Sequence, residues 1–169
     1  EGFGLDTATP LQRAVCRLLQ GLPLGGLADD PLIIRSLGGD KAIEQLPKKV
    51  PQEVLLLAGV RTAKSLLGAV LAIWASQTVK LDLVRKGEIP RFSILSLSLD
   101  NARGILGHLL GALTKPRLSA IKMRDEDMGE WVEIIDDSGS DLVGSVFVWH
   151  PSGHPIEIRV VAGRRAGGS

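Results

Sequence analysis

Apolar and polar residues follow two different periods along this chain, and together they predict alternating strands and helices. Residues 54–57 are four consecutive apolar residues, which is typical of a strand buried on both faces of a parallel sheet. Residues 65–78 carry the broad apolar surface of a helix that packs against a sheet. Residues 91–99 alternate apolar and small polar residues as a strand does, and the pair at 100–101 then caps a helix to about residue 113. Two successive strand–helix units favour an α/β fold with a largely parallel sheet flanked by helices.

The pattern changes in the last third of the chain, where short strand candidates are separated by turn-forming residues. The candidates are residues 130–135, 143–150 and 155–161. We interpret them as antiparallel hairpins added to the sheet or lying at its edge.

The first third of the chain carries helix signals. A helix over residues 10–19 begins after Thr9, which caps it, and has proline in its first position. Residues 21–49 contain two further helix starts, at Asp30 and at Asp40. We interpret 21–49 as a helical elaboration that precedes the central strand and supplies packing rather than chemistry.

Composition adds few constraints. The chain has 169 residues, 44% of them hydrophobic, and a formal net charge of +1, so we treat residues 1–169 as a single domain with a substantial core. The one cysteine, Cys16, can form no internal disulfide, which favours a reducing cytoplasm and a structural thiol. The apolar stretch at 66–74 is shorter than the roughly 20 residues of a membrane span, and we expect no signal peptide.

The candidate chemistry lies between residues 54 and 66, VLLLAGVRTAKSL, where an apolar run leads through small residues to Lys64 and Ser65. Strand, loop and helix in this order hold a nucleoside triphosphate on exposed backbone N–H groups at a helix N-terminus. Lys64 would neutralise the outer phosphates, and the Ser65 hydroxyl would hold Mg²⁺. The residues expected to bind the nucleotide here are Gly59, Val60, Arg61, Thr62, Ala63, Lys64 and Ser65.

The loop departs from the usual phosphate-binding pattern G-x-x-x-x-G-K-[ST]. Ala58 and Ala63 replace both glycines, and their methyl groups partly obstruct the close approach of a ligand. Gly59, next to the first position, is the residue we expect to take the tight turn. The alternative is an ordinary strand–helix junction in which Thr62 caps the helix and Lys64 points into water.

Other polar groups in the sequence favour structural interpretations. His150 and His154 flank a Pro-Ser-Gly turn, but no third metal ligand is near them in sequence, so we interpret them as a polar hairpin tip. The acidic residues between 125 and 141 fall mostly in turns, which favours solvated loops over a two-metal site. Residues 132–137, VEIIDD, match the residue types of the acidic strand of an ATPase. They lead into a turn, however, and we interpret them as edge structure.

Several of these features occur in a recognisable order. They are the Thr-Pro-Leu-Gln segment at 9–12, the loop at 57–65 with an arginine inside it, residues 96–113, and the turn-linked strands that lead to 160–168. In this order they resemble the N-terminal ATPase region of the large terminase subunit of a tailed bacteriophage or prophage, the motor that packages DNA into the capsid. The resemblance implies a P-loop NTPase-like fold.

The resemblance also implies roles for single residues. It assigns adenine recognition to Gln12, sensing of the terminal phosphate to Arg61, and the invariant phosphate and Mg²⁺ contacts to Lys64 and Ser65. Lys64 and Arg61 would then act directly in ATP hydrolysis, with ATP and Mg²⁺ as ligands.

The partners implied by the resemblance are those of a packaging motor. Arg164 or Arg165 occupies the place from which an arginine reaches the nucleotide of a neighbouring subunit in a homo-oligomeric ring. The implied partners are double-stranded DNA, the portal protein and the small terminase subunit. The implied location is the host cytoplasm, transiently at the capsid portal and not in a membrane, and the full-length protein would also be an endonuclease.

Three departures limit the resemblance: the two alanines in the loop, the missing acidic strand and the missing nuclease domain. Both ends of the chain look cut, so we expect a truncated ATPase domain, incomplete at its C-terminus, that binds ATP weakly without turning it over. One alternative is another P-loop nucleic-acid translocase, such as a helicase. A second alternative is a non-catalytic α/β interaction module.

Overall fold

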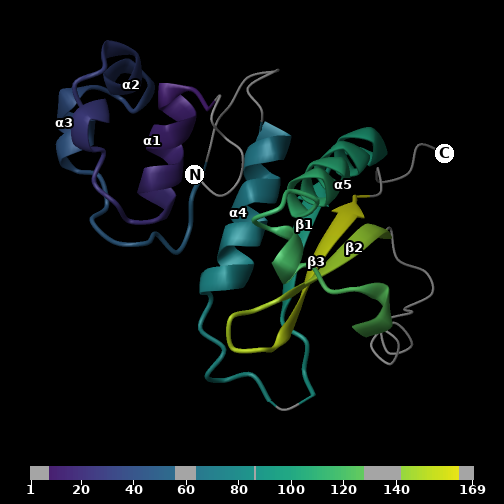
Figure 1. Ribbon diagram of the computed structural model, residues 1–169. Helices are drawn as coiled ribbons and strands as arrows, with labels where there is room; N and C mark the ends of the chain where they lie inside the picture. Colours follow the sequence, from purple (N-terminus) through teal and green to yellow (C-terminus); the bar gives the residue numbers. More distant parts are fainter. Residues whose placement is uncertain (1–7, 56–63, 86, 128–141, 164–169) are drawn as a thin grey trace. The chain divides into compact units, whose positions relative to one another are not determined.

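The computed structural model describes residues 8–55, 64–85, 87–127 and 142–163 (Figure 1). The chain divides into two compact units. One unit comprises residues 5–62, which we call the helical unit, and the other contains residues 63–169, which we call the sheet unit. Each has its own cluster of buried apolar side chains.

The helical unit contains the helices α1 (Pro10–Leu19), η1 (Gly25–Leu27), α2 (Pro31–Ser36) and α3 (Asp40–Glu44). The predicted caps of the first two α-helices are confirmed, because Thr9 accepts from the Gln12 N–H and Asp30 accepts from the Leu32 N–H. The segment 21–49 contains η1, α2 and α3 and belongs to this unit.

The third helix of this unit begins differently from the sequence expectation. The cap of α3 is Gly39, and Asp40 is its first residue. Gly39 has φ of 95°, in the left-handed region that glycine adopts without a steric penalty. The backbone therefore enters this helix through a glycine. The Asp40 carboxylate lies in the first turn, where its negative charge interacts favourably with the helix dipole.

The sheet unit places two long helices beside a small sheet. Its elements are α4 (Lys64–Thr78), β1 (Arg91–Ser96), α5 (Leu99–Leu113), η2 (Ser119–Ile121), η3 (Asp125–Asp127), β2 (Leu142–Trp149) and β3 (Pro155–Ala162). The strand order is β1-β3-β2, with β1 parallel to β3 and β2 antiparallel to β3. The predicted α/β class is confirmed in this form, a three-stranded mixed sheet flanked by helices.

Two features of the sheet differ from the expectation. Within the described residues one strand pair is parallel and one is antiparallel, so the sheet is mixed rather than largely parallel. The β2–β3 hairpin is present, but β3 lies at the centre of the sheet and not at its edge. The central position fits its sequence, because five consecutive residues of β3, from Ile156 to Val160, are buried. The strand predicted at 130–135 lies outside the described residues.

The junction between β1 and α5 also differs in detail. The strand ends at Ser96, and the helix begins at Leu99 with Ser98 as its cap. Ser98 has an extended backbone, and its Oγ accepts from the Asn101 N–H at 3.3 Å. The pair at 100–101 therefore forms part of the first turn, because the serine ahead of it already occupies the capping position.

The buried strand predicted at 54–57 is wrong for its first two residues. Val54 and Leu55 are in no strand, and they are 53% and 85% exposed. Residues 56 and 57 lie outside the described part of the chain. An apolar run forms a buried strand only where it has strands to pair with, and Val54 and Leu55 belong to the helical unit, whose regular elements in its described residues are all helices.

The core of the sheet unit lies between its two long helices and one face of the sheet (Figure 1). Ile156, Ile158 and Val160 of β3 are fully buried and cluster with Ile73 of α4 and Leu109 of α5. A polar contact joins the same layers, because the Gln77 side chain of α4 donates to the Trp149 carbonyl of β2 at 3.0 Å. The alternate residues of β3 therefore face away from the two helices.

Candidate functional site

The predicted phosphate-binding residues are described at only one end of the loop. Lys64 is the first residue of α4 and is exposed, and Ser65 follows it and is half-buried. The helix predicted at this point is confirmed, and it runs for 15 residues. Backbone N–H groups of a first helical turn have no partner within the helix, so they are available to a ligand or a cap.

The remaining candidates of the loop and the two arginines near residue 165 lie outside the described residues. These are Gly59, Val60, Arg61, Thr62, Ala63, Arg164 and Arg165. Their proposed contacts with nucleotide therefore stay predictions.

Gln12 has a structural task in the helical unit. Its Oε1 accepts from the Thr9 backbone N–H at 2.9 Å, while Thr9 Oγ1 accepts from the Gln12 N–H at 3.3 Å. This reciprocal pair is a capping box, which satisfies two backbone donors at the start of α1. Its acceptor oxygen is thus already engaged, and the two amide hydrogens remain for any further contact. Adenine recognition by Gln12 stays a prediction, and Lys64 belongs to the other compact unit.

Metal ligation has little support in the described part of the chain. No group of three or more His, Cys, Asp or Glu side chains gathers there in a form that could hold an ion. His150 and His154 instead meet at Ser152, whose Oγ lies 2.6 Å from Nδ1 of His150 and 3.4 Å from Nδ1 of His154. They form a hydrogen-bonded polar tip on the β2–β3 hairpin, as the sequence indicated.

A charged cluster lies on the face of the sheet that points away from α4 and α5, and we call it the Glu157 cluster. Glu157 is on the central strand, and its side chain is only 1% exposed. Its Oε1 accepts from Ser145 Oγ at 2.6 Å and from Arg159 Nε at 2.8 Å. Its Oε2 accepts from Arg91 Nε at 2.6 Å. One buried carboxylate thus joins all three strands through charged or hydroxyl donors.

The environment of Glu157 determines its ionisation. Burial on its own raises the pKa of the carboxyl group, and it is the largest single effect. The hydrogen bonds from Ser145, Arg159 and Arg91, with the positive charge of Arg91, together outweigh burial and leave the pKa below that of an ordinary glutamate. The group is therefore a carboxylate at neutral pH.

The Glu157 cluster was not predicted from the sequence. The available signal was the pattern of β3, in which Glu157 and Arg159 stand two residues apart and so share a face of the strand. The other partners are 12 residues away at Ser145 and 66 residues away at Arg91, and only the strand register brings them together.

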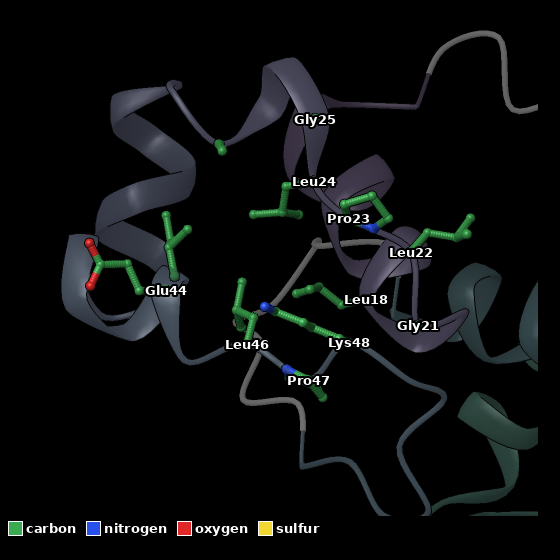
Figure 2. Close-up of a pocket in the computed structure, with 12 residues that line it drawn as sticks. Leu18, Gly21, Leu22, Pro23, Leu24, Gly25, Glu44, Leu46, Pro47 and Lys48 are labelled. Carbon is green, nitrogen blue, oxygen red and sulfur yellow. The ribbon is translucent and has the colours of Figure 1, made fainter.

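An apolar hollow of about 440 Å³ lies in the helical unit (Figure 2). Leu18, Leu24 and Leu46 gather around it, whereas the carboxylate of Glu44 points away. Among the described residues that line it, Lys48 is the only cation. Such a lining suits aliphatic groups and is a poor match for a polyphosphate, which requires several donors and positive charges.

Cys16 of α1 is a free, half-buried thiol. Burial raises its pKa, so the reactive thiolate is disfavoured. This agrees with the structural role expected from the sequence.

Comparison with protein-family models, with curated proteins and with solved structures finds no match to this chain. Among the described residues, no helix combines the length and apolar character needed to cross a bilayer.

Proposed function

We propose that this chain is the ATP-binding part of a terminase-like DNA-packaging motor, which couples ATP hydrolysis to the movement of double-stranded DNA into a capsid. The observation that carries the proposal is the start of α4. A 15-residue helix begins at Lys64, and an ammonium group and a hydroxyl group follow one another in its first turn. The sequence order from Gln12 through this loop to the later strands adds support.

The residues at the start of α4 fit the chemistry of magnesium triphosphate. A helix N-terminus carries the equivalent of about half a positive charge and unpaired N–H groups, both of which favour phosphate oxygens. Lys64 adds a full positive charge, and the Ser65 hydroxyl is a hard oxygen ligand of the kind Mg²⁺ prefers. Magnesium, when bound, would neutralise charge on the phosphate chain.

The proposed mechanism relies on positioning and charge. Lys64 holds the outer phosphates, Ser65 holds Mg²⁺ and Arg61 senses the terminal phosphate, so charge that develops during phosphoryl transfer to water is stabilised. Gln12 reads adenine through its amide hydrogens, because its oxygen is engaged by Thr9. These hydrogens match an acceptor nitrogen on the edge of the base.

A DNA-packaging motor acts together with neighbouring subunits, DNA and other proteins. Arg164 or Arg165 would contact the nucleotide of an adjacent subunit in a ring, and the ring would grip duplex DNA through its phosphates. The portal protein and the small terminase subunit would position the ring at the capsid, in the host cytoplasm.

Calorimetry with a non-hydrolysable magnesium-ATP analogue tests the nucleotide site. We expect the full chain to bind the analogue and Lys64→Ala to bind it at least about tenfold more weakly, since a charge-assisted contact to phosphate is lost. Lys80→Ala is the matched control, because Lys80 is exposed, has the same charge and lies just beyond the other end of α4. This control should bind as the unmodified chain does.

Equal binding by Lys64→Ala and the unmodified chain would eliminate the proposed site. Absence of binding by all three proteins would favour a non-catalytic α/β interaction module. The role of Gln12 is tested by competition. If binding depends on Lys64 but other nucleotides displace the analogue as readily as adenine nucleotides do, Gln12 does not recognise adenine.

A further inference from the structure

The Glu157 cluster brings two arginine side chains together on one face of the sheet. Arg91 of β1 lies opposite Glu157 of β3, and Ser145 of β2 lies opposite Arg159 of β3. Residues paired in this way project to the same side of a sheet. That side is the one that faces away from the packed core of α4 and α5, whose β3 members are Ile156, Ile158 and Val160.

Each arginine uses its inner nitrogen to hold the carboxylate. Both guanidinium groups donate from Nε to Glu157, which leaves the two terminal nitrogens of each group without a hydrogen-bond partner among the described residues. In the described residues that are not exposed, no fully buried side-chain nitrogen lacks a hydrogen bond, so the terminal nitrogens of Arg159 are not fully buried. The Arg91 side chain is 45% exposed and that of Arg159 is 10% exposed.

The charges in the cluster do not balance. Two guanidinium groups surround a single carboxylate, so within the described part of the chain the cluster carries one surplus positive charge. Ser93 of β1 lies opposite Arg159 on the same face and is exposed, so its hydroxyl group adds a hydrogen-bond donor to the face that carries the two guanidinium groups. An anchored guanidinium has already lost much of its rotamer freedom, so it binds a further oxyanion at a lower entropic cost than a free arginine does.

We propose that Arg91 and Arg159 form a binding site for a phosphoryl group. Glu157 is the positioning residue, since it fixes both guanidinium groups through Nε and leaves their terminal N–H groups to the ligand. Tetrahedral phosphate oxygens accept the paired N–H groups of a guanidinium in a bidentate manner. The phosphoryl group is either free phosphate or a phosphodiester of nucleic acid, and the site is separate in sequence from Lys64 and its loop.

The test is a titration of the full chain with inorganic phosphate, followed by NMR of the arginine Nε–Hε groups and of the backbone amides. We expect the Nε–Hε signals of Arg91 and Arg159 to shift with a common saturation curve. Arg91→Gln should weaken phosphate binding by about tenfold or more, because a charge-assisted contact and the surplus charge are lost together.

Arg103→Gln is the matched control. Arg103 is an exposed arginine of α5 whose side chain has no hydrogen bond or ion pair with another described residue, and the substitution changes the net charge equally. It should leave phosphate binding unchanged. Equal weakening in both variants would reduce the effect to net charge and overturn the proposal.

The NMR signals of the unmodified chain also test the proposal. If Arg91→Gln fails to fold, the unmodified chain still decides the matter, because unshifted Nε–Hε signals of Arg91 and Arg159 at saturating phosphate overturn the site. The Nε–Hε signals report on Arg91 and Arg159 alone, so failure of the nucleotide proposal at Lys64 does not affect this one.

The source of the phosphoryl group is decided by a second titration, with a short oligonucleotide in place of phosphate. Binding that is weakened by Arg91→Gln and not by Arg103→Gln assigns the site to a nucleic-acid phosphodiester. Binding of inorganic phosphate without binding of the oligonucleotide assigns it to a free phosphate or phosphate monoester.

Discussion

Glu157 shows how much one buried residue can determine in a small sheet. A carboxylate removed from water is strongly disfavoured unless donors replace its hydration. Here three donors from three different strands do so, Arg91, Ser145 and Arg159. The carboxylate consequently requires the strands to keep their register, because a slip by one residue would turn Arg91 of β1 or Ser145 of β2 to the other face.

At the residue scale we predict that Glu157→Gln lowers the free energy of unfolding at neutral pH by about 1–3 kcal/mol, since two guanidinium groups lose their charged acceptor. The folded pKa of Glu157 is depressed, so its contribution is complete above the pKa of an unfolded glutamate, about 4.3. That contribution is lost as the pH falls through the lower folded pKa.

Urea unfolding at several pH values between 7 and 3 measures this effect. The difference between Glu157→Gln and the unmodified chain should shrink toward the acid end. Glu126→Gln is the control, because Glu126 is exposed and its side chain has no hydrogen bond or ion pair with any residue that the structure describes. A difference that stays constant with pH would show that the carboxylate contributes nothing through its charge.

The residues that the sequence analysis identified correctly act on near neighbours. Thr9 and Asp30 cap helices through N–H groups three and two residues away, so local sequence is sufficient to find them. Glu157 binds Arg91 across 66 residues, and such a pair emerges only from strand register. Of the proposed nucleotide site, the sequence correctly predicted the helix that contains Lys64 and Ser65. The capping role of Gln12 was missed, although Thr-x-x-Gln is the sequence signature of a capping box.

The same division holds for whole elements. Helix α4 and the β2–β3 hairpin follow from apolar period and turn residues within the element. The failed strand at 54–55 and the central position of β3 depend on which strands are available as partners. A run of apolar residues predicts burial, but the neighbours that provide it are set by the whole fold.

Gly21 follows α1 and illustrates a constraint between elements. Its φ is 66°, and a Cβ built on it would lie 2.5 Å from the Lys49 carbonyl carbon and 2.5 Å from the Val50 nitrogen. Two backbone segments therefore approach too closely for any side chain. The close approach ties the end of α1 to the segment that follows α3.

At the element scale we predict that Gly21→Ala destabilises the helical unit by about 1–3 kcal/mol, through backbone strain and the displacement of residues 49–50. Gly26→Ala is the control, because nothing lies within 4 Å of a Cβ at that position. It should change stability by no more than about 0.5 kcal/mol. Thermal unfolding followed by far-UV circular dichroism compares the two, and equal effects would contradict the close approach.

At the scale of the whole molecule, the chain has two cores with no residue in common. Ile33 is fully buried in the core of the helical unit, and Leu109 is fully buried in that of the sheet unit. Each core is made from side chains of its own unit, so the stability of each depends first on its own packing.

Ile33→Ala and Leu109→Ala should each lower the free energy of unfolding by about 2–5 kcal/mol, because each leaves a cavity in its core. We predict that the two substitutions speed the hydrogen exchange of different sets of backbone amides. Native-state hydrogen exchange should show faster exchange mainly in α1 and α2 for Ile33→Ala, and mainly in α4, α5 and β3 for Leu109→Ala. Uniform acceleration across both units in either variant would mean that the chain opens as one cooperative body.

The central place of β3 has a consequence for synthesis. In the described sheet, β1 and β2 each pair with β3, which comes later in the chain than both. While the protein emerges from the ribosome, α4 and α5 are therefore made well before the surface that covers their apolar sides. The described sheet therefore cannot form until residues 155–162 have been made, because β1 and β2 pair only with β3 in it.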